Sequence, residues 1–141
     1  MKILVFLVSV LGSVTALAAG SASRIPANSS ELIIDCGTPK NFSGLSASIS
    51  GKLKLSQLPN GAAKGTGKLK ISLLNPRTPW AGVKTVIGQY DDLTSVNSDR
   101  YFHGGATIRN SDDIMDIYVN FSRPEMSYVE YDNATYKMVC K

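Results

Sequence analysis

The stretch L-S-A-S-I-S-G-K-L-K-L-S, residues 45–56, decides the fold class. Apolar residues or glycine occupy every odd position, and serine or lysine occupies every even position. A period of two puts the apolar side chains on one side of an extended strand and the polar side chains on the other. We therefore expect a strand with one buried and one solvated face, with a bend or bulge at Gly51.

A second stretch, residues 65–73, repeats the same alternation. The Pro-Asn-Gly sequence at residues 59–61 lies between the two stretches. A two-residue Asn-Gly turn would pair apolar positions with polar ones, whereas a three-residue loop with its glycine in the left-handed region keeps each face uniform. The sequence therefore predicts a hairpin in which Lys52 faces Lys68.

The C-terminal region predicts another hairpin, because Asp132-Asn133 suits a two-residue turn with positive φ. Residues 115–121 alternate in the same way, and weaker strand patterns cover 82–90 and 100–109. No window has a convincing helical period. We expect an all-β protein: a single small antiparallel β-sandwich or barrel of about eight strands.

The N-terminus has the pattern of a secretory signal peptide. Lys2 precedes an apolar run, and small residues follow it, with cleavage expected after Ala18 or as late as Ala22. We assign 1–18 to a signal peptide, 19–30 to a flexible segment and 31–141 to one β-domain. The chain is then secreted or periplasmic. It is not expected to be transmembrane, because the apolar run is too short for a spanning helix and the clean strands have polar faces.

The two cysteines, Cys36 and Cys140, lie close to the two ends of the mature chain. In an oxidising compartment the simplest arrangement is one disulfide that joins the first and last strands, although free thiols or intermolecular pairing are alternatives. Loop-closure entropy assigns such a long loop a stabilisation of about 4.7 kcal/mol.

Charge is segregated along the chain. Residues 36–90 contain eight basic and no acidic residues, whereas residues 91–132 contain nine acidic and three basic ones. In the predicted hairpin, one exposed face carries Lys52, Lys54, Lys68 and Lys70. This face is either an ordinary solvated surface, an anion-binding surface or the contact for self-association of basic with acidic halves. Nucleic-acid binding is not expected, because no aromatic residue is interleaved for base stacking.

Other candidate sites are weaker. His103 stands in a His-Gly-Gly run, but the chain lacks the nucleophile motif that an esterase requires, so we expect no catalytic residues. The acidic residues at 112, 113 and 116 lack a calcium-loop pattern, and we expect no metal and no cofactor.

Asp116, Tyr118 and Asn120 alternate on one predicted outer face and form a candidate glycan platform. Trp80 could be a core residue or an exposed anchor.

These patterns favour a non-enzymatic exported binding module that uses the lysine-rich hairpin face toward an anionic macromolecule or an envelope surface. One alternative is a small barrel that carries an apolar ligand in its interior. Another is an inhibitor of an extracellular enzyme, although the sequence offers no obvious reactive loop.

Overall fold

A computed structural model describes residues 31–59, 61–91, 99–110 and 112–141. The predicted signal peptide and the segment 19–30 lie outside the described residues and stay predictions. The elements are β1 (Glu31–Gly37), β2 (Ser46–Gln57), β3 (Ala63–Leu74), β4 (Trp80–Asp91), β5 (Tyr101–Thr107), β6 (Ile114–Asn120), the 3-10 turn η1 (Pro124–Met126), β7 (Tyr128–Tyr131), β8 (Ala134–Lys137) and β9 (Val139–Cys140). The predicted all-β class is confirmed. No helix in the described part is long and apolar enough to cross a membrane.

The strands form one sheet that closes on itself where β8 meets β2. Consecutive strands from β1 to β8 pair antiparallel, and β9 pairs with β1. A single parallel bridge joins Ser46 of β2 to Lys137 of β8. The backbone N–H of Lys137 also donates to the carbonyl of Leu45 at 3.0 Å. The result is the expected sandwich- or barrel-like body.

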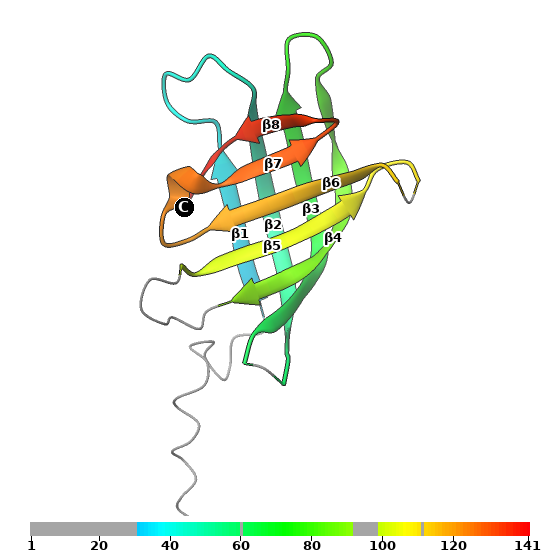
Figure 1. Cartoon of the computed structure of the whole chain (residues 1–141). Helices are drawn as coiled ribbons and strands as arrows, with labels where there is room; N and C mark the ends of the chain where they lie inside the picture. The colour runs from blue at the N-terminus through cyan, green and yellow to red at the C-terminus, as the bar shows by residue number, and fades with distance from the viewer. Residues whose placement is uncertain (1–30, 60, 92–98, 111) are drawn as a thin grey trace, which may run out of the picture.

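The sheet folds into two layers, and β4 passes from one to the other. In Figure 1, β1, β2 and β3 lie behind β5, β6, β7 and β8, with the two sets of strands crossing. Where β4 passes from β3 to β5, three glycines are direct partners across the strands: Gly65, Gly88 and Gly104. The ring of Phe102 lies against all three, so the absence of side chains there lets the backbones approach closely around it.

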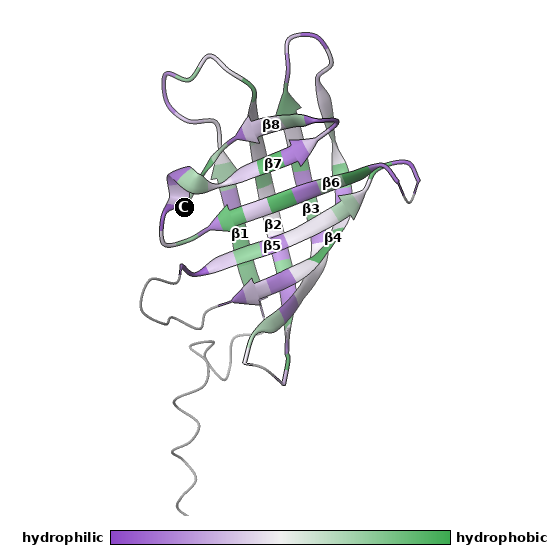
Figure 2. Ribbon diagram, viewed as in Figure 1, coloured by the Kyte–Doolittle hydropathy of each residue, from purple (hydrophilic) through white to green (hydrophobic). Residues whose placement is uncertain are grey.

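The alternation predicted from the sequence separates core from surface, and Figure 2 shows hydrophobic and hydrophilic residues alternating along β6. The interior is filled by fully buried side chains from both layers: Ile34, Ile49, Leu53, Leu69, Ile71, Leu73, Val86, Phe102, Met115, Ile117, Val119 and Met138. At about 25 cal/mol per Å² of apolar surface removed from water, this core is the main source of stability. Trp80 is partly buried and packs against the core, which favours the first of its two expected roles.

Both predicted hairpins are confirmed. Gly61 has a φ of 90°, and Leu58 and Ala62 face each other across the first loop, whose Asn60 lies outside the described residues. Lys52 and Lys68 occupy facing positions in the register set by the pairs on either side, Gly51 with Leu69 and Lys54 with Thr66. The ladder has no pair at positions 52 and 53 themselves, next to Gly51, whose φ is 149°. In the second hairpin, Asp132 and Asn133 have φ values of 52° and 60°.

The predicted disulfide is also confirmed. Cys36 and Cys140 are direct register partners on β1 and β9, and a bond joins their sulfur atoms across a sequence separation of 104. Both cysteines are buried, with exposed fractions of 4%. A disulfide of this kind fits an oxidising compartment.

We expect loss of the disulfide to destabilise the fold strongly. Replacing both cysteines by serine should lower the free energy of unfolding by about 2–5 kcal/mol, because the unfolded chain regains the conformations that the closed loop excludes. Urea denaturation measures this difference. In a reducing buffer the wild type and the variant should unfold at similar urea concentrations; a difference that persists there would contradict the explanation.

The glycine row should be as sensitive to substitution as the core. A Cβ at Gly88 would overlap the backbone of His103 and Gly104, so Gly88→Ala should cost about 1–3 kcal/mol in a denaturation experiment. Gly37→Ala is the matched control, because a Cβ there meets nothing within 4 Å. Equal stability of the two variants would show that close backbone approach does not shape this bend.

Candidate functional site

The four lysines predicted to share a face lie on adjacent central strands of one layer. Lys52 and Lys54 belong to β2, and Lys68 and Lys70 belong to β3; all four are exposed. We call this set the basic face. Their apolar neighbours along the strands, Leu53 and Leu69, are completely buried, so the lysine side chains start from the opposite, outward side.

Little opposite charge balances the basic face. Lys52 Nζ lies 3.5 Å from a carboxylate oxygen of Glu31, its neighbour on β1, in a solvent-exposed ion pair. Lys54, Lys68 and Lys70 form no ion pair with any residue that the structure describes. Asp35, the other carboxylate on the outer side of β1, is paired with Lys141 at 3.5 Å. Three lysines of the basic face are therefore available to an external anion.

The other layer carries a row of tyrosines on its outer side. The ring of Tyr118 on β6 has one tyrosine on each neighbouring strand, with centroids 5.7 Å from Tyr101 and 5.3 Å from Tyr128. Burial raises the pKa of Tyr101 and of Tyr128, and the nearby carboxylates Asp91 and Glu130 raise them further. Because its neighbours cover it on both sides, the Tyr118 ring is not free to stack on a sugar.

His103 completes this cluster as an exposed residue of β5. Its Nε2 lies 2.9 Å from Asp116 Oδ1. Its ring packs edge-to-face against the ring of Tyr118, with 5.9 Å between the two centroids. Asp116 and Tyr118, two members of the candidate glycan platform, are thus engaged with neighbours in the same layer. The two partners of His103 are thus a carboxylate and a tyrosine ring, and neither is the serine or cysteine that forms a nucleophile–base pair with an imidazole.

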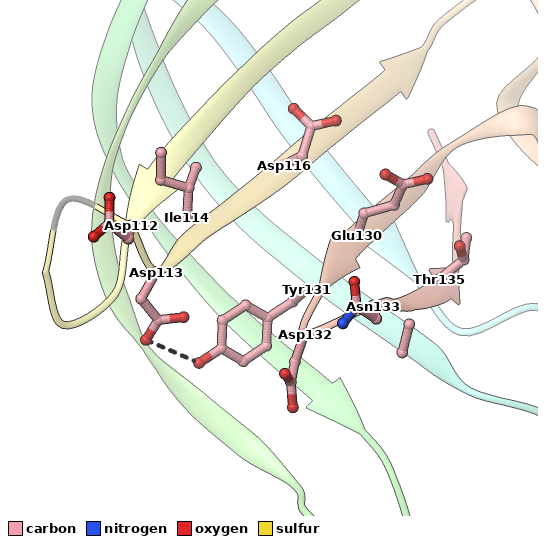
Figure 3. Close-up of a pocket in the computed structure, with 10 residues that line it drawn as sticks. Asp112, Asp113, Ile114, Asp116, Glu130, Tyr131, Asp132, Asn133 and Thr135 are labelled. Carbon is pink, nitrogen blue, oxygen red and sulfur yellow. Dashed lines mark hydrogen bonds between the residues drawn. The ribbon is translucent and has the colours of Figure 1, made fainter.

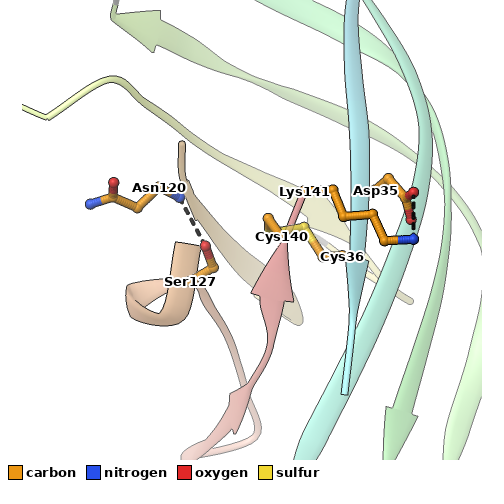
Figure 4. Close-up of a disulfide and its surroundings, with 6 residues drawn as sticks. All are labelled: Asp35, Cys36, Asn120, Ser127, Cys140 and Lys141. Carbon is orange, nitrogen blue, oxygen red and sulfur yellow. Dashed lines mark hydrogen bonds and ion pairs between the residues drawn. A yellow bond between two sulfur atoms is a disulfide. The ribbon is translucent and has the colours of Figure 1, made fainter. Parts of the chain in front are cut away.

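Asn120, the third platform residue, does not lie on the outer surface as expected. It is fully buried, and its side chain contacts Asp99, Tyr118 and the backbone of Ser122 and Arg123. Its Nδ2 donates to Asp99 at 2.9 Å and to the Tyr118 hydroxyl at 3.1 Å, and its Oδ1 accepts from the backbone N–H groups of Ser122 and Arg123. Its own N–H donates to Ser127 Oγ, near the disulfide (Figure 4). The side chain has no capacity left for a ligand.

Asp99 links this network to the surface. The Arg123 guanidinium donates to Asp99 Oδ2, with Nε at 2.9 Å, and lowers the pKa of the carboxyl group, with a further contribution from the Asn120 amide. A carboxyl group with a lowered pKa in the folded state stabilises the fold above its unfolded pKa, and this contribution disappears as the pH falls through the folded value. The network is therefore structural and resists mild acid.

Acidic residues gather in a hollow of about 540 Å³ between the β5–β6 and β7–β8 turns (Figure 3). Five carboxylates line it: Asp112, Asp113, Asp116, Glu130 and Asp132. The Tyr131 hydroxyl donates to Asp113 Oδ2 at 3.3 Å. Burial, followed by the charge of Asp113, raises the pKa of Tyr131. Among the described residues, no group of histidine, cysteine and carboxylate side chains is arranged to hold a metal ion.

The packing of the interior decides whether the domain has room to carry an apolar ligand, which was the alternative function. Met115, Ile117 and Val119 are completely buried and Tyr136 nearly so, and these side chains occupy the space that a carried ligand would need. An apolar hollow of about 380 Å³ does exist, but it lies at the surface, between the β1–β2 and β3–β4 loops beside Phe42 and Leu74. The packing therefore does not favour an internal carrier.

Asn120 should be one of the most sensitive polar positions. Asn120→Ala should lower the free energy of unfolding by about 2–4 kcal/mol, because the change leaves several buried polar groups without partners. Chemical denaturation tests this value. Asn110→Ala is the control: Asn110 is exposed and accepts one backbone N–H, from Asp112, so its loss should cost about 1 kcal/mol or less. A neutral Asn120→Ala would contradict the structural role.

Comparison with known proteins gives no match. No protein family model matches the chain, and no curated protein or solved structure matches it either. What the molecule binds therefore has to be inferred from its own surface chemistry.

Proposed function

We propose that this chain is an exported, non-enzymatic binding domain that attaches through its basic face to an anionic macromolecule or an envelope surface. The observation that carries the proposal is the grouping of four exposed lysines on two adjacent strands, three of them without an ion pair in the described part of the chain. The disulfide and the predicted signal peptide support a location outside the reducing cytoplasm.

The fold itself gains nothing from this grouping. Like charges that face each other across neighbouring strands destabilise a sheet by tenths of a kcal/mol. Lys52 and Lys68 occupy such facing positions, and Lys70 is a neighbour on the same face. Serines at other outward positions of β2, such as Ser50, show that an uncharged residue also suits this surface. An anionic partner would turn the mutual repulsion into attraction.

The distribution of the remaining charges supports attachment by this side. The outer side of the opposite layer bears carboxylates, among them Asp116 and Glu130, which face each other on β6 and β7. An anionic surface therefore repels that layer and attracts the basic face, so the domain would attach in one orientation.

Removing the lysines should abolish attachment without unfolding the domain. The variant Lys52→Ser, Lys54→Ser, Lys68→Ser, Lys70→Ser should bind a soluble polyanion such as heparin at least about 100-fold more weakly at low salt, since each lysine near an anionic surface contributes about 1 kcal/mol. Fluorescence titration with labelled heparin at rising NaCl measures both the affinity and its salt dependence.

A control with the same net charge separates a local site from overall attraction. Lys40, Arg77, Arg109 and Lys137 are exposed and lie off the basic face, so their replacement by serine removes four positive charges elsewhere. We expect a much smaller loss of affinity in that control. Equal losses in the two variants would mean that net charge alone drives binding and would overturn the proposed site.

A further inference from the structure

The basic face is bordered on both sides by exposed aliphatic side chains. Ile33 on β1 is the direct partner of Lys52, and its side chain is 63% exposed. On the other side, Val83 on β4 is the partner of Lys70 and is 61% exposed. Ile87, also on β4 and 52% exposed, is the partner of Thr66.

These residues make one surface because β1, β2, β3 and β4 are neighbours in the sheet. Adjacent strands are about 4.8 Å apart, so the aliphatic residues on the outer strands lie within reach of the lysines on the central ones. The surface thus has a positively charged centre and apolar margins. The two carboxylates of β1 that share it, Glu31 and Asp35, are each paired with a lysine.

Resting on the proposed function, we infer that the anionic partner is the surface of a lipid bilayer that contains anionic lipids. A soluble polyanion engages only the ammonium groups and leaves the aliphatic margins in water. A bilayer offers phosphate oxygens to the lysines and, just beneath them, an apolar boundary to Ile33, Val83 and Ile87. The long lysine side chains allow this, because their methylene groups lie along apolar surface while the charge stays at the headgroups.

Charge alone would not select this partner, but the combination of charge and apolar surface does. An aliphatic side chain that leaves water adds affinity that salt does not screen, whereas the contribution of the lysines falls as ionic strength rises. The acidic outer side of β5–β8 would point away from the membrane, which fixes the orientation of the domain. Binding should therefore require anionic lipid and retain a part that persists at higher salt.

The test is co-sedimentation of the disulfide-bonded mature chain with lipid vesicles. Vesicles of phosphatidylglycerol and phosphatidylcholine in equal parts should bind the protein, and vesicles of phosphatidylcholine alone should not. The variant Ile33→Thr, Val83→Thr, Ile87→Thr should bind the anionic vesicles about tenfold more weakly, yet bind heparin as the wild type does. Threonine retains a high strand preference, which protects the fold.

The matched control replaces three exposed apolar residues elsewhere. Ile114, Met126 and Phe42 are 55%, 49% and 40% exposed and lie outside β1–β4, so their change to threonine should leave vesicle binding unaltered. Near-equal urea midpoints for the two triple variants and the wild type confirm that folding is not the cause of any loss. If the midpoints differ, the single variant Val83→Thr, which preserves side-chain shape, replaces the triple variant and should give a smaller loss of about twofold.

The outcomes separate this inference from the proposed function. Heparin binding without binding to anionic vesicles would overturn the bilayer as partner and leave the basic face as an anion-binding site. Equal vesicle binding by the two triple variants would overturn the role of the aliphatic margins, and equal binding to both kinds of vesicle would overturn the requirement for anionic lipid. Failure to bind either heparin or vesicles would contradict the proposed function itself.

Discussion

The closure of the sheet by the two terminal segments of the chain, β1 and β8–β9, is the constraint on which the rest of the structure depends. The Cys36–Cys140 bond fixes β9 against β1, and beside it the Lys141 side chain forms an ion pair with Asp35 (Figure 4). The backbone N–H of Lys141 also donates to the carbonyl of Asp35 at 2.9 Å. With β1 and β8 on one side and β3 on the other, β2 cannot shift its register. A slip of one residue would turn its lysines inward and its leucines outward, so closure also determines which side chains reach solvent.

The meandering order of the strands explains why a charge asymmetry in the sequence becomes an asymmetry of the molecule. Strands that are consecutive in the chain lie side by side, so the basic half of the sequence builds most of one layer and the acidic half builds the other. The two outer sides consequently differ in chemistry: one combines lysine with aliphatic residues, and the other combines carboxylates with tyrosine. A domain with this distribution is suited to lie between two different environments.

The sequence was sufficient where a local rule determined the structure. The period of two and the turn residues at 59–61 and 132–133 specified both hairpins, and the position of Cys140 on an inward strand face agreed with its disulfide. Asn120 was assigned wrongly to the surface: alternation along β6 places it outward, and its burial comes with contacts to Asp99 and to the backbone of Ser122 and Arg123, which no strand period reveals.

The aliphatic margins were also not predicted. On β4 the inward positions combine the buried Val86 and Tyr90 with Gly82, Lys84 and Gly88. The outward positions include the aliphatic residues Val83 and Ile87, so neither side of this strand is uniform. No period in the sequence could reveal this, because the orientation of β4 depends on its pairing with β3 and β5.

The central claim, attachment through the outer side of β1–β4, is tested most directly by backbone amide NMR shifts on addition of a short heparin fragment. Perturbations confined to β2, β3 and their neighbours would agree with the account; perturbations centred on β5–β8 would contradict it.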